Sequence, residues 1–177
     1  MKKIAVLGLG KVGALAAQLL HDAKFQVIGF DMREANEDFN FETKVVDLSS
    51  VESMRTEFEK IDAVLSCLPF HLNIAISQLA HDTGIHYFDL TADVATTNAI
   101  IELGKTSLGV MAPQCGLAPG FIGIVGASLI AQLSECRSCR MRVGALPQHP
   151  TGLLGYSFNW SAEGVVNEYL NDCEVIE

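Results

Sequence analysis

Basic residues are scarce in this chain of 177 residues. The 12 lysines and arginines face 21 aspartates and glutamates, which leaves a formal net charge of −9 at pH 7. Binding to a phosphate backbone needs clustered basic side chains that displace counterions. The shortage of basic residues therefore predicts that nucleic acid is not a partner.

A long uninterrupted apolar segment is also missing. Residues 116–133 contain Pro119 and several glycines, and they fall short of the roughly 20 apolar residues that a membrane span needs. Residues 1–17 resemble a signal peptide, but Lys11 interrupts the apolar run, and the same residues fit a strand, a glycine turn and a helix. We expect a cytoplasmic protein with no membrane partner.

Cysteines at zinc-binding spacing are missing as well. The five cysteines are an odd number in a chain without an export signal, which indicates free thiols in a reducing compartment. Cys136 and Cys139 form a single Cys-x-x-Cys pair, and no second pair lies at zinc spacing. We interpret the pair as ordinary thiols and expect no metal site.

Short apolar segments, by contrast, are abundant and alternate in type. Runs rich in β-formers alternate with segments of helical apolar spacing, which predicts an α/β fold: a Rossmann-type, doubly wound parallel sheet with helices on both faces. We expect strands within residues 2–10, 25–31, 43–47, 62–69, 85–90 and 108–113. We expect helices around residues 12–20, 51–60, 74–80, 96–106 and after Pro119 and Gly120.

Apolar stripes on these helices should face the sheet. In the first helix the stripe consists of Val12, Leu15, Ala16, Leu19 and Leu20. In the third it consists of Ile74, Ala75, Leu79 and Ala80. In the helix after Pro119, Gly120, Gly123 and Gly126 would permit close packing against the sheet or a second domain.

A glycine-rich turn follows the first expected strand and opens the first helix. It has the sequence G-x-G-x-x-G and consists of Gly8, Leu9, Gly10, Lys11, Val12 and Gly13. In this context the pattern predicts a dinucleotide site. Gly8 permits the tight turn, Gly10 lets a pyrophosphate approach the backbone, and Gly13 lets the helix pack closely.

Asp31 ends the next strand, at the distance that this pattern expects. Its carboxylate should accept hydrogen bonds from the ribose hydroxyls and repel a 2′-phosphate, which favours NAD as the cofactor. Arg33 lies two residues further on and leaves NADP possible.

The sequence changes character after Leu133. Residues 139–147 alternate like a strand with one solvated face, and residues 161–170 suggest a short helix capped by Ser161. We therefore expect a dinucleotide-binding domain at residues 1–134. Residues 135–177 are expected to begin a second α+β domain whose remainder is absent from this sequence.

The chain resembles the saccharopine dehydrogenase-like oxidoreductases, which include lysine 6-dehydrogenase, and corresponds to their N-terminal portion. The matching segments are "VLGLGKVG", "DAVLSCLPFHLNIAISQLA", "GIHYFDLTADV", "PQCGLAPGFIGI" and "VGALPQHPTGLLGYSFNWSAEGVVNEYL". The resemblance implies a nicotinamide-dependent enzyme that oxidises or forms a C–N bond in an amino acid of the lysine or saccharopine type. It also implies that the full-length protein is a homodimer.

The resemblance also implies roles for residues at the carboxyl ends of the strands. Asp47 and Leu48 would border the adenine. The segment after the fourth strand would run beside the cofactor toward the nicotinamide, and it consists of Cys67, Leu68 and Pro69.

Three residues near the same edge are candidates for catalysis. His71 would be a general base, or it only begins a surface helix. Asp89 would hold a substrate ammonium group or cap the next helix. Cys115 would be a nucleophile or a small wall residue.

Two functions fit these observations. The first is hydride transfer by an NAD(P)-dependent amino acid dehydrogenase, of which this chain is the cofactor-binding portion. The second is a dinucleotide-binding sensor or regulatory module without catalysis, because few residues remain to hold a substrate.

Overall fold

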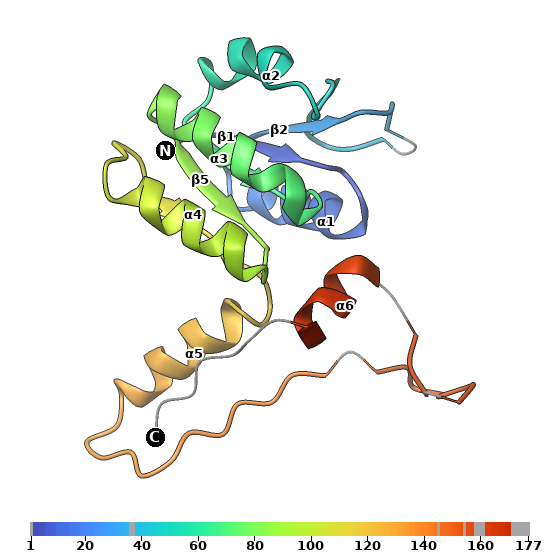
Figure 1. The fold of residues 1–177 in the computed structure, drawn as a ribbon, viewed down its shortest axis with the longest axis vertical. Helices are drawn as coiled ribbons and strands as arrows, with labels where there is room; N and C mark the ends of the chain where they lie inside the picture. The colour runs from blue at the N-terminus through green and yellow to red at the C-terminus, as the bar shows by residue number, and fades with distance from the viewer. Residues whose placement is uncertain (1, 36–37, 145, 154, 158–161, 171–177) are drawn as a thin grey trace.

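A six-stranded parallel sheet forms the centre of the molecule (Figure 1). The structure, a computed structural model, describes residues 2–35, 38–144, 146–153, 155–157 and 162–170. The strands lie in the order β3-β2-β1-β4-β5-β6. They are β1 (Lys3–Leu7), β2 (Gln26–Asp31), β3 (Glu42–Val45), β4 (Ala63–Ser66), β5 (His86–Asp89) and β6 (Met111–Ala112). Each lies within one of the expected strand segments or overlaps it, and the predicted Rossmann-type, doubly wound fold is confirmed.

Helices cover both faces of this sheet. They are α1 (Lys11–Asp22), α2 (Val51–Phe58), α3 (Phe70–Thr83) and α4 (Val94–Gly104). Val6 and Leu7 are neighbours in β1, so their side chains point to opposite faces. Leu7 belongs to a large core cluster with residues of α2, α3 and α4, whereas Val6 belongs to a smaller cluster with Ala17 of α1. The core is therefore divided into two layers by the sheet.

Helix α1 packs through its small residues and through only part of the predicted stripe, of which Leu20 contacts the smaller core cluster. Gly13 and Ala17 are its buried residues, whereas Val12, Leu15 and Leu19 are 50–60% exposed. The backbone of α1 lies so close to the β1 turn that only residues with little or no side chain fit between them. The predicted packing of Val12, Leu15 and Leu19 is therefore wrong.

Helix α3 follows its predicted stripe only in part. Leu79 and Ala80 are buried, as expected, together with Ile76. Ile74 is 46% exposed, and Ala75 is also exposed. The buried face of α3 is therefore rotated away from the predicted one.

The order of the strands reverses at β1: β2 and β3 lie on one side of it, and β4, β5 and β6 lie on the other. β1 pairs with β2 on one side and with β4 on the other. Because all strands are parallel, their carboxyl ends lie at one edge, and the crevice between β1 and β4 is where ligands of such sheets bind. This edge positions the site described below.

The second half of the chain is organised differently. Helix α5 (Phe121–Ile130) and the segment after it extend away from the sheet (Figure 1). No strand forms within the described residues 139–144 and 146–147, so the strand predicted there is wrong. A strand needs a hydrogen-bonded neighbour, and these described residues pair with none.

A last helix follows this segment. Helix α6 (Ala162–Leu170) agrees with the predicted helix, and its predicted cap, Ser161, lies outside the described residues. The division into domains at residue 134 stays a prediction.

Candidate dinucleotide-binding site

The glycine-rich turn has the backbone geometry that a phosphate-binding turn needs. Gly8 has a φ of +85°, a conformation that favours glycine. Its N–H donates to the Phe30 carbonyl at 2.8 Å, which ties the turn to β2. A Cβ on Gly13 would lie 1.8 Å from the Gly8 carbonyl oxygen, so α1 can approach the turn only with glycine at this position.

Gly10 leaves open space where a ligand would pass. A Cβ built on Gly10 would meet no atom within 4 Å. Gly10 is also the N-cap residue of α1, and no side chain caps this helix end. The first N–H groups of a helix have no partner within the helix, and they carry the positive end of its dipole. The turn can therefore receive the pyrophosphate of a dinucleotide.

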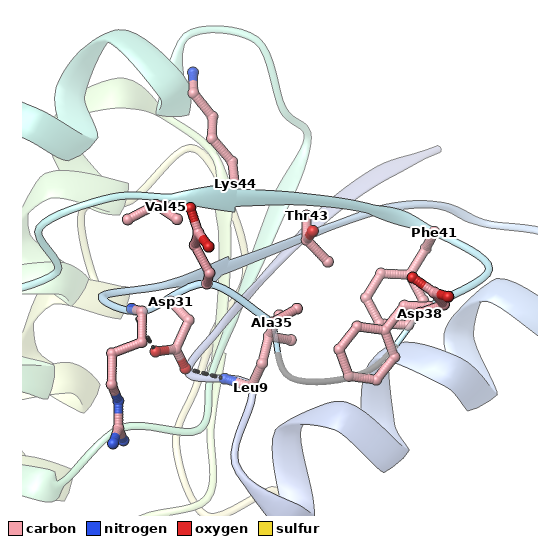
Figure 2. A pocket seen from close by; sticks show the side chains of 11 residues that line it. Leu9, Asp31, Ala35, Asp38, Phe41, Thr43, Lys44 and Val45 are labelled. Atoms are coloured by element: carbon pink, nitrogen blue, oxygen red, sulfur yellow. Dashed lines mark hydrogen bonds between the residues drawn. The ribbon is translucent and has the colours of Figure 1, made fainter.

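Asp31 joins the glycine-rich turn to the end of β2. Its Oδ2 accepts a hydrogen bond from the Leu9 N–H at 2.8 Å, and its Oδ1 accepts one from the Arg33 N–H at 3.0 Å (Figure 2). An ionised carboxylate has about four acceptor sites. Asp31 therefore keeps acceptor capacity for the two hydroxyls of a ribose.

A pocket of about 420 Å³ opens beside Asp31. Phe39 and Phe41 stack within it, with 4.8 Å between their ring centroids. The residues that line the pocket are Leu9, Asp31, Arg33, Glu34, Ala35, Asp38, Phe39, Phe41, Thr43, Lys44 and Val45. The sequence reasoning did not find Glu34, Asp38 or the two phenylalanines. The acidic residues that follow Asp31 in the loop before β3 were the available signal.

Carboxylates outnumber cations in this pocket. Asp31, Glu34 and Asp38 line it together with Arg33 and Lys44. Figure 2 shows that the Lys44 side chain extends to the opposite side of β3 from Thr43. There its ammonium group pairs with Glu57 of α2. The charge of Lys44 is therefore compensated outside the pocket.

The end of β4 forms the other wall of the glycine-rich turn. A Cβ on Gly8 would lie 2.9 Å from Leu68, and one on Gly13 would lie 3.2 Å from the Cys67 Cβ. Burial, and to a lesser extent the charge of Asp89, raises the pKa of the Cys67 thiol to about 12. Pro69 is exposed and precedes α3. The structure thus brings Cys67 and Leu68 to the glycine-rich turn, and Pro69 follows them in the chain.

The residues predicted beside the adenine, Asp47 and Leu48, follow β3, whose last residue Val45 pairs with Asp31. The Val46 N–H donates to the Asp31 carbonyl at 2.9 Å, which places Asp47 after this pair. Asp47 is exposed, and hydrogen bonds from the Ser49 hydroxyl and N–H lower its pKa. Leu48 is 2% exposed and packs in the core, so its side chain faces no ligand.

The three candidates for catalysis are not arranged as a reactive group. His71 is exposed in the first turn of α3, with its ring edge-on to Phe70. Asp89 is fully buried, and Asp93 is the residue that caps α4, through a bond of 2.8 Å from the Thr96 N–H. The alternative that Asp89 caps this helix is therefore wrong.

Cys115 lies beside Asp89 at the end of β6. Its thiol donates to the Ala112 carbonyl at 3.4 Å, and burial together with the charge of Asp89 raises its pKa. A protonated thiol is a poor nucleophile. This geometry favours the role of a wall residue for Cys115.

The fold and this edge define the chain as a Rossmann domain that binds a dinucleotide. A family model described as "Saccharopine dehydrogenase NADP binding domain" matches residues 4–111, and the chain belongs to this family. The resemblance inferred from the sequence is thereby confirmed. The cofactor is accordingly NAD or NADP.

A solved structure of a saccharopine dehydrogenase shares the fold. Apo histidine-tagged saccharopine dehydrogenase (L-Glu forming) from Saccharomyces cerevisiae is 18% identical, with a TM-score of 0.65, over 94% of this chain and 40% of that chain. The chain thus spans about two fifths of that protein. A GalE-like L-threonine dehydrogenase from Cupriavidus necator (holo form) is 19% identical, with a TM-score of 0.44, over 49% of this chain and 36% of that one.

Neither a metal centre nor a membrane-spanning helix is found in the part of the chain that the structure describes. Among the described residues, no group of three or more histidine, cysteine, aspartate or glutamate side chains is placed to hold a metal ion. Within the same part of the chain, no helix combines the length and the apolar character needed to cross a membrane.

Proposed function

We propose that this chain is the cofactor-binding portion of an NAD(P)-dependent oxidoreductase. The reaction is hydride transfer at a C–N bond of an amino acid of the saccharopine or lysine type. The observation that carries the proposal is that Asp31 is hydrogen-bonded to the glycine-rich turn, in which Gly10 leaves open space for a ligand. Family membership supports the oxidoreductase class.

The residues of this chain bind and orient the cofactor. The first turn of α1 would hold the pyrophosphate, Asp31 would accept hydrogen bonds from the ribose hydroxyls, and the ends of β4 and β6 would border the nicotinamide. The bound nicotinamide supplies the hydride acceptor or donor. The chain contributes placement of that ring, which is the main requirement for hydride transfer.

The charges around Asp31 support NAD as the preferred cofactor. A 2′-phosphate would enter a pocket lined by three carboxylates. Of its two cations, Lys44 is neutralised by Glu57, which leaves Arg33. Like charges repel strongly at partly buried sites. We therefore propose that NADH binds more tightly than NADPH.

Calorimetry with NADH and NADPH tests this function. We expect NADH to bind, and Asp31→Ala to weaken its binding by roughly 10- to 100-fold, because hydrogen bonds to charged groups contribute about 1.5–3 kcal/mol each. Asp82→Asn changes an exposed carboxylate on α3 and serves as the matched control. Failure of the wild-type chain to bind either dinucleotide would contradict the proposal.

A non-catalytic sensor is the second candidate function. It is favoured by the burial of Asp89 and by the bonding of the Cys115 thiol to a backbone carbonyl, which leave neither group in position to act on a substrate. Turnover of lysine or saccharopine by the full-length protein, measured as NADH absorbance, distinguishes the two. Activity would rule the sensor out, and NADH binding without turnover of these amino acids would favour it.

A further inference from the structure

Asp89 has a set of contacts that neither predicted role explains. Its carboxylate is fully buried at the end of β5. Oδ2 accepts a hydrogen bond from the Tyr87 hydroxyl at 2.8 Å, and Oδ1 accepts bonds from the N–H groups of Thr91 at 3.0 Å and Gln114 at 3.2 Å. Three donors thus occupy a group that a substrate ammonium was predicted to contact.

Two of the contacts of Asp89 reach the loop after β6, 25 residues further along the chain. Besides the bond from Gln114 to the carboxylate, the Cys115 N–H donates to the Asp89 carbonyl at 2.7 Å. Gln114 has a φ of +62°, which is uncommon for a residue other than glycine and persists only where the surroundings hold it. Asp89 supplies that support from both its side chain and its backbone.

We propose that Asp89 is a positioning residue, whose buried carboxylate fixes residues 113–120 against the end of β5 and thereby places Cys115 at the edge of the cofactor site. Cys67 follows Ser66, the residue paired with Asp89 in the sheet, and packs with the core cluster on the face opposite Tyr87. The proposal rests on the proposed function only for the statement that this edge borders the cofactor.

The placement has a chemical consequence for the two thiols. The groups that titrate around Asp89 are Tyr87, Cys67 and Cys115. Burial raises the pKa of all three, and the charge of Asp89 raises it further. The thiolate is the reactive form of a cysteine, so Asp89 adds to burial in keeping the two thiols unreactive.

Site-resolved alkylation with iodoacetamide tests the proposal without any cofactor. The rate at Cys115 is measured by mass spectrometry between pH 6 and 10 in the wild type, Asp89→Asn and Asp89→Ala. Cys136 and Cys139 are exposed thiols and give an internal reference in every sample. Asp82→Asn is the control for loss of an exposed carboxylate.

The two variants should differ in a defined way. Asp89→Ala leaves buried N–H groups without an acceptor, so the loop opens and Cys115 reacts roughly 10- to 100-fold faster. Asp89→Asn keeps an acceptor but removes the charge, so the alkylation profile of Cys115 moves to lower pH and the rate at pH 8 rises several-fold. The reference thiols should be unchanged.

If Cys115 is alkylated in both variants at the same rate and with the same pH profile as in the wild type, the proposal is overturned. If Asp89→Ala does not fold, the pH profile of Asp89→Asn decides alone. Calorimetry with NADH on the wild type runs in parallel. A wild type that fails to bind NADH would contradict the proposed function, while the thiol rates would still decide the role of Asp89.

Discussion

Residues 2–112 and helix α5 both contain many apolar side chains, but only residues 2–112 bury them. In residues 2–112 the sheet and four helices bury residues such as Phe30, Phe58 and Tyr87 completely. Helix α5 consists almost wholly of apolar and small residues, yet none of them is buried. A helix that is apolar on all sides is normally a buried one. The comparison shows that a local sequence can form its helix without burying an apolar face.

The two regions also use glycine differently within helices. Gly13 of α1 is surrounded by the backbone of Gly8 and the side chain of Cys67. Gly123 of α5 has nothing within 4 Å of its Cβ position. The same residue type is thus a packing requirement in one region and a source of flexibility in the other.

Truncating one phenylalanine in each region should give the largest difference. Phe58→Ala removes a fully buried ring and should lower the free energy of unfolding by about 3–5 kcal/mol. Phe121→Ala, at a residue that is 60% exposed, should change it by less than about 0.5 kcal/mol. Urea unfolding measures both. A large loss for Phe121→Ala would mean that α5 is buried in solution and would remove the contrast.

Replacing Gly13 or Gly123 by alanine should give the next largest difference in the free energy of unfolding. Gly13→Ala forces the backbone of α1 away from the turn and should cost about 3 kcal/mol, together with NADH binding. Gly123→Ala should instead stabilise α5 by up to about 1 kcal/mol through helix propensity. Thermal unfolding and calorimetry measure the two effects. Equal effects at the two sites would contradict the packing described for α1.

The buried carboxylate of Asp89 and the exposed one of Asp47 should affect stability in opposite ways as the pH changes. Burial raises the pKa of Asp89 above its ordinary value, so the wild type loses stability as the pH rises from 3.8 through the raised pKa. Asp89→Asn cannot ionise, so its stability relative to the wild type should increase over this window. Asp47, whose pKa is lowered, should show the opposite trend on substitution by Asn. Urea midpoints from pH 3 to 7 test both signs.

Breaking a contact between helix α6 and residues 2–112 should have the smallest effect. The Asn167 side-chain amide of α6 donates to Asp93 Oδ1 at 3.0 Å. Asn167→Ala should cost about 1 kcal/mol, seen as faster amide hydrogen exchange in α6 with no change in the sheet. Glu168→Gln, at an exposed neighbour, is the control. Unchanged exchange in α6 would show that this bond does not hold the helix.

Much of the cofactor site was predictable because its signals are local. Gly8, Gly10 and Gly13 lie within one turn, and Asp31 lies at a fixed distance along the chain. The network around Asp89 was not predictable, because its partner Gln114 is distant in sequence and its bond depends on how β5 and β6 end. Glu34 and Asp38 were missed because loop residues reveal their direction only in three dimensions.

The sequence by itself determined the alternation of strands and helices, the glycine-rich turn and the acidic residue that closes it. These depend on residue periodicity and on backbone freedom, which act over a few residues. Only the tertiary structure decided that α1 packs through Gly13 and Ala17, that Asp89 is buried and bonded by the Gln114 N–H, and that no residue of α5 is buried. The physical reason is that burial and hydrogen bonding of these groups depend on atoms far away in the chain.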